Sequence, residues 1–111
     1  MTDVTSGLLT PGTLELFSHK TRDKILAASL VLFNQRGFGA VTTASIAEQA
    51  GILEGTLWYH FRAKKDILSA HIVLLQTVFA KENTQADSGD PETIVNGIFR
   101  SYDVIWDFRY L

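Results

Sequence analysis

The sequence predicts an all-α protein: a three-helix helix-turn-helix domain, a long connecting helix and the first part of a second helical domain. Two patterns predict this fold. Apolar residues recur every three or four positions, which is the spacing of one helix face, and glycines separate short segments of this kind. The length of 111 residues, 46% of them hydrophobic, suits one small domain and the start of another. We therefore divide the chain into an arm (1–18), a helix-turn-helix domain (19–79, with its motif at 42–61) and the beginning of a second domain (80–111).

The arm contains a turn signal, Pro11-Gly12, followed by a small apolar cluster (Leu14, Leu16 and Phe17) that predicts a brief helix packed on the body. From Thr21 the apolar residues follow helical spacing, and Gly37 is suited to end a helix because glycine readily adopts a left-handed backbone. We therefore expect the first long helix over about residues 21–36.

Two short helices follow. Thr42 can cap the first and Gly51 can end it, which leaves about two turns. A helix this short is not stable alone, so we expect its apolar residues (Ile46, Ala47 and Ala50) to pack against the first long helix. The second lies within residues 52–61, where Leu57 and Phe61 stand four residues apart and are expected to face inward together.

A fourth helix is predicted from about Ala63 to Lys81, with a wide apolar stripe that is more typical of packing than of a ligand wall. Residues 83–91 are polar and predict a loop. Asp90 is then expected to cap a last helix, with Pro91 in its first position. The apolar face of that last helix predicts that a partner subunit or further sequence covers it; its members are Ile94, Val95, Ile98, Phe99, Tyr102, Ile105 and Trp106.

Composition excludes several classes of function. The absence of cysteine rules out disulfides and thiolate metal sites. The three histidines (His19, His60 and His71) lack paired ligand spacing, so we expect no metal and no cofactor. No apolar run approaches the roughly 18 to 20 residues that cross a bilayer, and the amino end does not resemble a signal peptide. We therefore expect a soluble cytoplasmic protein with no membrane partner.

The net charge of −2 does not argue against a nucleic-acid partner, because the charge is unevenly distributed. Residues 20–66 contain seven basic and four acidic side chains, a net charge of +3, and the rest of the chain carries −5. A basic segment of under fifty residues is the expected electrostatic signature of a phosphate-binding module.

Residues 42–68 closely resemble the DNA-binding domain of the TetR (tetracycline-repressor-like) family of bacterial regulators, and the resemblance extends over about residues 20–79. The matching positions are Thr42, Ile46-Ala47, Ala50-Gly51, Gly55-Thr56-Leu57-Trp58, Phe61 and Lys64. The resemblance implies a homeodomain-like domain of a transcriptional regulator, not an enzyme, and most often a repressor. It further implies a homodimer on a pseudo-palindromic DNA operator, and a small-molecule effector, of unknown identity, bound by carboxy-terminal helices that are mostly absent from this chain.

The candidate DNA-binding residues follow from this arrangement, because a recognition helix presents its amino-terminal residues to base edges while flanking groups contact phosphates. Gly55 allows close approach of the backbone, and Thr56 offers a hydroxyl to phosphate and a methyl to thymine. The complete set is Thr42, Thr43, Ala44, Leu53, Glu54, Gly55, Thr56, Trp58, Tyr59, His60 and Lys64.

Three of these positions make the base-specific contacts hard to predict. Leu53 stands where the resemblance implies Ser or Thr, and Ala44 stands where an arginine that reads bases is frequent. Glu54 repels phosphate, although it can accept a hydrogen bond from cytosine.

Several alternatives stay open at this stage. Trp58 and Tyr59 are compatible with core positions, and Lys65 with an ordinary solvated surface. The apolar face at residues 94–106 suits a helical protein-interaction module without DNA binding. An enzyme is a weaker third alternative, because the sequence shows no nucleophile and base pair and no paired carboxylates. If the regulator hypothesis holds, we expect Thr56→Ala and Lys64→Ala to weaken operator binding without changing the melting curve.

Overall fold

A computed structural model describes residues 8–86 and 91–111, and all regular secondary structure in them is helical. This confirms the predicted all-α class. The elements are α1 (Pro11–Leu14), α2 (Thr21–Arg36), the 3-10 helix η1 (Phe38–Ala40), α3 (Thr43–Ala50), α4 (Glu54–His60), α5 (Lys64–Ala86) and α6 (Pro91–Asp107).

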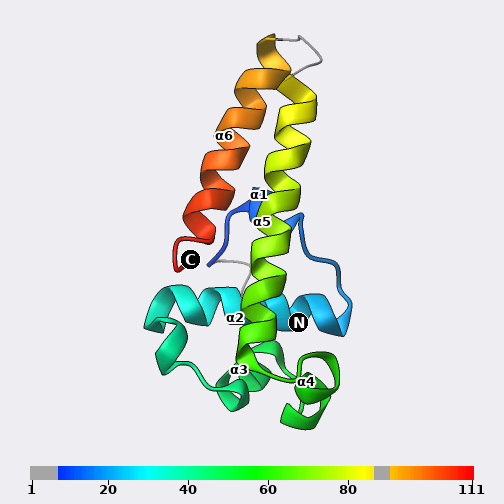
Figure 1. Ribbon diagram of the computed structural model, residues 1–111, viewed down its shortest axis with the longest axis vertical. Coiled ribbons are helices and arrows are strands. Elements are labelled where there is room, and N and C mark those ends of the chain that lie inside the picture. Colours follow the sequence, from blue (N-terminus) through cyan, green and yellow to red (C-terminus); the bar gives the residue numbers. More distant parts are fainter. Residues whose placement is uncertain (1–7, 87–90) are drawn as a thin grey trace.

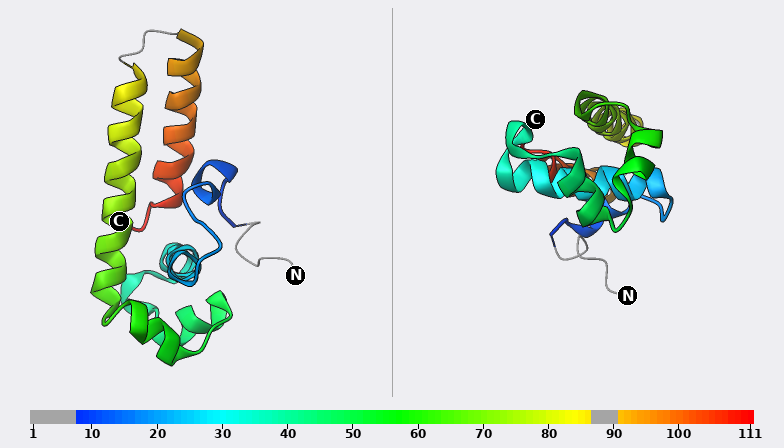
Figure 2. Two further views of the ribbon diagram at one scale, coloured as in Figure 1. Left: turned by 90° about the vertical axis from the view of Figure 1, so that its right-hand side faces the viewer. Right: turned by 90° about the horizontal axis from the view of Figure 1, so that it is seen from below.

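The long helix α5 is the axis of the molecule, which measures 47 × 28 × 24 Å (Figure 1). Helix α2 crosses the lower part of α5 at a steep angle. This is visible in Figure 2, where the left view shows α2 end-on beside the upright α5. Helices α3 and α4 lie at the lower end, and α6 runs back along the upper part of α5. The small helix-turn-helix end is therefore joined to the α5–α6 pair by one continuous helix.

Helix α2 has the predicted bounds, and its end has a clear cause. Gly37 adopts φ +82°, a conformation that side chains disfavour, and its N–H donates to the carbonyl of Phe33 at 2.9 Å. Arg36 lies in the last turn, where a positive charge is favourable against the helix dipole. Local sequence signals are thus sufficient to place this helix.

The first hydrophobic core lies where α2, α3, α4 and α5 meet, and it holds the helix-turn-helix together. Ile46, Leu57 and Phe61 are all buried there, and Ala50 packs against its edge. This confirms that the short helices pack on α2 and that the inward face of α4 is the expected one. The buried members are Ile25, Leu26, Ala28, Leu32, Phe33, Val41, Ile46, Ala47, Leu57, Phe61 and Ile67.

A second core joins the amino-terminal segment to α2, α5 and α6. Its buried residues are Leu9, Ala27, Leu30, Val31, Val78, Val104 and Phe108, with Leu14, Leu16 and Phe17 packed against them. A brief helix does lie in the arm, and the apolar cluster packs on the body as expected. The helix is α1, however, which covers the predicted turn at Pro11-Gly12 and ends at Leu14, so Leu16 and Phe17 follow it. This core contains residues from all three predicted parts of the chain, so the proposed domain boundary between residues 79 and 80 stays a prediction. Residues 1–7 of the arm lie outside the described residues.

The predicted loop at residues 83–91 is wrong over its first half. Helix α5 continues past Lys81 to Ala86, and α6 begins at Pro91 as expected. Polarity alone does not separate a solvated helical turn from a loop, which explains the error. The expected cap, Asp90, lies outside the described residues.

Helix α6 buries a different set of residues from its apolar stripe. Gly97, Val104 and Asp107 of α6 are buried, as is Phe108 directly after it, whereas Tyr102 and Trp106 are 67% and 63% exposed. Val95 and Ile105 are exposed too. The side chains of Ile94, Ile98 and Phe99 are not among those that the structure describes. The described part of the stripe is thus uncovered, in line with the expectation that it needs a partner surface.

A polar network fastens the end of α6 to the rest of the molecule. The buried Asp107 carboxylate accepts hydrogen bonds from the N–H and the hydroxyl of Thr10, at 2.8 and 2.7 Å. The Asn34 side chain donates to the Asp107 carbonyl at 2.6 Å and accepts from the Tyr110 N–H at 3.1 Å. These bonds connect α1, α2 and α6 over sequence separations of 73 to 97 residues.

His71 of α5 is fully buried at the junction of both cores. Its Nε2 lies 2.9 Å from the Leu26 carbonyl, which can only accept, so we assign the proton to Nε2. Its Nδ1 then accepts from the Tyr110 hydroxyl. Burial lowers the pKa of His71 to about 4, against a smaller opposing effect of the Leu26 carbonyl, and burial raises the pKa of Tyr110. His71 is therefore a neutral structural residue at neutral pH.

Candidate DNA interface

The start of α3 is fixed by a reciprocal capping box. The Thr42 hydroxyl accepts from the Ser45 N–H at 3.1 Å, and the Ser45 hydroxyl accepts from the Thr42 N–H at 3.2 Å. This confirms Thr42 as the cap. The first residues of α3 face outward, since Thr42 and Ala44 are exposed and Thr43 is partly buried.

The turn between α3 and α4 depends on Gly51. This residue ends α3 in the left-handed conformation, at φ +74° and ψ +33°, and the Ile52 N–H then donates to the Ala47 carbonyl at 3.0 Å. A side chain with a β-carbon is disfavoured in that backbone. Gly51 therefore sets the angle at which α4 leaves α3.

Helix α4 has one buried face and one exposed face. Leu57 and the following Phe61 anchor it in the first core. At 100° per residue, Gly55 and Tyr59 lie on the opposite side of α4 from Leu57. Tyr59 is 86% exposed, and Glu54 and Gly55 are exposed as well. The structure thus places Tyr59 on the surface, not in the core.

The other predicted contacts of α4 surround this exposed face. Leu53, just before the helix, is 79% exposed. Trp58 is 50% exposed, so about half of its side chain packs against the protein and half faces solvent. Thr56 and His60 are partly buried on the other flank. All seven predicted contact residues between Leu53 and His60 are therefore at least partly exposed. Leu57, which was not predicted as a contact, is the buried residue of this segment.

Glu54 is held back from the exposed face by a bond to α3. The Thr43 hydroxyl donates to its Oε2 at 2.8 Å. This contact links the first turns of α3 and α4 and occupies one carboxylate oxygen. No local sequence pattern predicts this bond, because the two residues are eleven positions apart.

Lys64 has a structural role that sequence reasoning missed. Its ammonium donates to the carbonyls of Phe38 and Val41, at 2.7 and 2.8 Å, and lies 4.5 Å from the centre of the Phe38 ring. An ammonium has three N–H donors, so one remains for a phosphate. Lys64 therefore braces the η1 turn beside α3 as well as carrying a charge at the candidate site.

Lys64→Ala is accordingly expected to lower the free energy of unfolding by about 1 to 2 kcal/mol, since it removes two charge-assisted bonds from a partly exposed side chain. The neighbouring Lys65 is exposed, so Lys65→Ala is the matched control and is expected to change stability by less than about 0.5 kcal/mol. Urea unfolding measures both. Equal stability of the two variants would contradict the bracing role. The expected loss of stability corrects the sequence-based expectation that Lys64→Ala leaves the melting curve unchanged.

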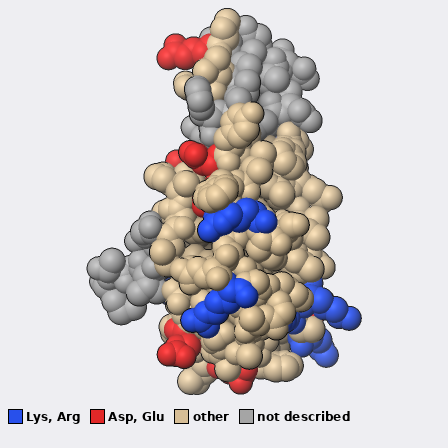
Figure 3. Space-filling model, turned by 90° about the vertical axis from the view of Figure 1, so that its left-hand side faces the viewer, with Lys and Arg blue, Asp and Glu red and all other residues tan. Residues whose placement is uncertain are grey.

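Further basic side chains surround the helix-turn-helix end. Arg22 lies with its guanidinium carbon 5.1 Å from the centre of the Phe61 ring, and Lys24, Arg36, Arg62 and Lys65 are exposed. On the face shown in Figure 3 the visible Lys and Arg side chains lie in the middle and lower part of the molecule. The net positive segment predicted from the sequence thus forms surface around α2 to α5.

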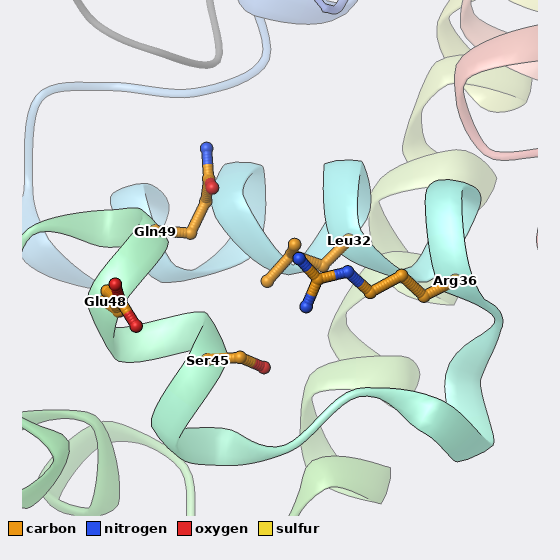
Figure 4. A pocket seen from close by; sticks show the side chains of 5 residues that line it. All are labelled: Leu32, Arg36, Ser45, Glu48 and Gln49. Atoms are coloured by element: carbon orange, nitrogen blue, oxygen red, sulfur yellow. The ribbon is translucent and has the colours of Figure 1, made fainter.

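A shallow pocket of about 320 Å³ lies between α2 and α3 (Figure 4). Leu32 and Arg36 line it from α2, and Ser45, Glu48 and Gln49 line it from α3. Binding sites for small molecules are mostly apolar, whereas four of these five side chains are polar or charged. We therefore assign no ligand to this pocket.

Within 8–86 and 91–111, no group of three or more His, Cys, Asp or Glu side chains lies close enough together to hold a metal ion. Over the same ranges, no helix combines the length and apolarity needed to cross a membrane.

Comparison with known proteins gives one consistent family. Residues 25–71 match the family model described as bacterial regulatory proteins, tetR family. Over 80 residues the chain is 32% identical to the HTH-type transcriptional repressor KstR2 of Mycobacterium tuberculosis, covering 70% of this chain and 40% of that protein. It is 28% identical over 76 residues to the tetracycline repressor protein class C of Escherichia coli, covering 68% of this chain and 35% of that protein.

A shorter match, 40% identical over 47 residues, is to KstR2 of Mycolicibacterium smegmatis and covers 42% of this chain and 23% of that protein. The chain thus spans less than half the length of each of these relatives. No solved structure gives a significant match.

Proposed function

We propose that this chain, which belongs to the TetR family of bacterial regulators through its helix-turn-helix domain, is a DNA-binding transcriptional regulator. One observation carries the proposal: Leu57 and Phe61 anchor α4 in the core, while Leu53 and Tyr59 project from it with 79% and 86% of their surface exposed. A short helix that is anchored in a core on one side and projects side chains on the other has the arrangement that a recognition helix needs in the major groove. The match to a family of regulators supports a role other than catalysis.

In this function α4 is the recognition helix in the major groove, and the start of α3 contacts the phosphate backbone. The contacting residues are those predicted above: Thr42, Thr43, Ala44, Leu53, Glu54, Gly55, Thr56, Trp58, Tyr59, His60 and Lys64. We infer repression as the effect on transcription, by analogy with relatives named as repressors. Since bacterial DNA lies in the cytoplasm, this function entails a cytoplasmic location.

We further propose that the protein acts as a homodimer on a pseudo-palindromic operator. The two recognition helices must then lie roughly 34 to 36 Å apart, or a multiple of that distance. The exposed apolar side chains of α6, Tyr102 and Trp106 among them, support the need for a covering surface. Sedimentation or light scattering with and without operator DNA measures this stoichiometry.

The proposed small-molecule effector acts through α5. This helix begins beside α4 and continues along α6, so displacement of the α5–α6 pair moves the recognition helix. An effector releases DNA only if it favours a spacing of the two recognition helices that does not fit the operator.

The function is tested by fluorescence anisotropy with duplexes from a randomised library and from the gene's own promoter region, at 50 and 200 mM salt. We expect sequence-selective binding that weakens steeply with salt, as phosphate contacts require. Thr56→Ala is expected to weaken binding about tenfold, the effect of losing a hydrogen bond to a charged phosphate. Thr77→Ala is the matched control, because that hydroxyl bonds within α5 to Val73.

The second candidate function is a helical protein-interaction module, favoured by the exposed Tyr102, Ile105 and Trp106 of α6. Such a module has no selective, salt-sensitive affinity for DNA. If the protein binds no duplex selectively while retaining its fold by circular dichroism, the regulator proposal fails and this alternative gains.

A further inference from the structure

We propose that Leu53 is a specificity-determining residue that recognises the 5-methyl group of thymine in the major groove. This inference rests on the proposed function and names a base contact within it. Leucine is an unusual residue for the position that Leu53 occupies. Leu53 is the N-cap of α4, with extended backbone (φ −74°, ψ 147°), and its side chain makes no capping bond.

Nothing in the described residues explains leucine at this position. N-caps favour Ser, Thr, Asp and Asn, whose oxygens accept from the free N–H groups of the first turn, and leucine is among the poorest choices. Its side chain is also 79% exposed and is in neither hydrophobic core. The fold therefore gains neither a cap nor buried apolar surface from Leu53, so its benefit is expected in a complex.

The neighbouring residues leave Leu53 as an isolated apolar projection. The next side chain, Glu54, is bonded to Thr43 of α3 at 2.8 Å. Gly55 follows with no side chain, and a β-carbon placed on it would meet no atom within 4 Å. The first turn of the recognition helix thus presents a leucine beside bare backbone.

Base edges offer one apolar group to such a side chain. In the major groove thymine presents its C5 methyl and cytosine only a hydrogen at C5, whereas the nitrogen and oxygen groups of the base edges are hydrogen-bond donors and acceptors. Leucine placed against polar edges removes water from them without replacing its hydrogen bonds, which is unfavourable. Contact with a methyl removes apolar surface of both partners from water. Leu53 is therefore expected to favour a thymine in each half-site. A cytosine carrying a 5-methyl group shares this chemistry.

The test uses the protein with the duplex enriched from a randomised library, replacing one thymine at a time by deoxyuridine, which lacks only the methyl. At one thymine per half-site, removing the methyl is expected to weaken wild-type binding about fourfold, the effect of one buried methyl-sized group. Leu53→Ala is expected to lose that sensitivity at the same position. A cytosine at that position should bind better when 5-methylated, by a similar factor.

Leu53→Ser is the second variant, because serine restores a capping oxygen and preserves the fold. Loss of the methyl effect in both variants, with unchanged circular dichroism, supports the assignment. Equal sensitivity of wild type and both variants at every thymine overturns it while leaving the proposed function intact. Failure to enrich any duplex overturns the proposed function itself, and this assignment with it.

Discussion

Gly55→Ala is expected to stabilise the protein and at the same time to weaken its binding to DNA by at least tenfold. The two effects have opposite signs because they arise in different states of the molecule. In the free chain Gly55 lies in the first turn of α4 without a positive φ, and an added β-carbon meets no atom within 4 Å. Alanine is therefore accommodated there.

The stabilising effect follows from the backbone entropy of glycine. Alanine restricts the unfolded chain and suits a helix better, which contributes roughly 0.5 to 1 kcal/mol where the native backbone is compatible. Glycine is thus unfavourable for the folded chain at this position. Its presence is explained if the backbone of α4 approaches the duplex where a methyl group does not fit.

The weakening effect is a steric one. Gly55 shares the outward face of α4 with Tyr59, whose side chain is 86% exposed, so the added methyl points toward the proposed DNA. Moving the helix outward to relieve the clash weakens the surrounding contacts, and a tenfold loss corresponds to about 1.4 kcal/mol. Urea unfolding and fluorescence anisotropy measure the two effects on one preparation.

Gly39→Ala is the matched control. Gly39 lies in η1, also lacks a positive φ and also has open space around its β-position, but it is not part of the recognition helix. We expect no loss of DNA affinity from this change. A Gly55→Ala variant that is more stable and binds DNA as tightly as wild type would show that the backbone of α4 does not approach the duplex closely.

The parts of the fold that the sequence predicted correctly are those with local signals. Thr42 caps α3, and Gly37 and Gly51 end α2 and α3, because each acts on backbone groups within a few positions. The inward pair Leu57 and Phe61 follows from helical spacing in the same way. These signals are sufficient to place the helix-turn-helix and to orient its exposed face.

The parts that were missed depend on contacts between distant positions. Thr10 and Asp107 are separated by 97 residues, and His71 and Tyr110 by 39. A single sequence carries no pairing information for such contacts, since each residue is acceptable on a surface as well. The bracing role of Lys64 was hidden for the same reason, because its two acceptors are backbone carbonyls, which every residue has. The candidate site was therefore predictable as a set of residues, but its internal bonds were not.

Acidification is expected to destabilise the protein through His71, by about 2 to 3 kcal/mol between pH 7.5 and 4.5. Burial lowers the pKa of His71 to about 4 in the folded protein, whereas the value in the unfolded chain is near 6.5. The unfolded state therefore takes up the proton first. The stabilisation is fully present above pH 6.5 and is lost as the pH falls from 6.5 toward 4.

The surroundings of His71 explain why protonation is resisted. Both ring nitrogens have partners in the neutral form: Nε2 donates to the Leu26 carbonyl, and Nδ1 accepts from the Tyr110 hydroxyl. The imidazole is buried among the rings of Phe33, Phe108 and Tyr110, which solvate a charge less well than the water they exclude. The pKa of Tyr110 is raised, so its hydroxyl stays protonated throughout this pH range.

Urea unfolding at several pH values measures the effect, and the difference between variants isolates it from the titration of carboxylates. His71→Gln keeps an N–H donor for Leu26 without a titrating ring, so its stability is expected to depend less on pH, by about the 2 to 3 kcal/mol assigned to His71. His19→Gln, at an exposed histidine, is expected to retain the full pH dependence. If His71→Gln and wild type lose stability in parallel on acidification, His71 is not the group that the unfolded state protonates first, and the acid sensitivity arises elsewhere in the chain.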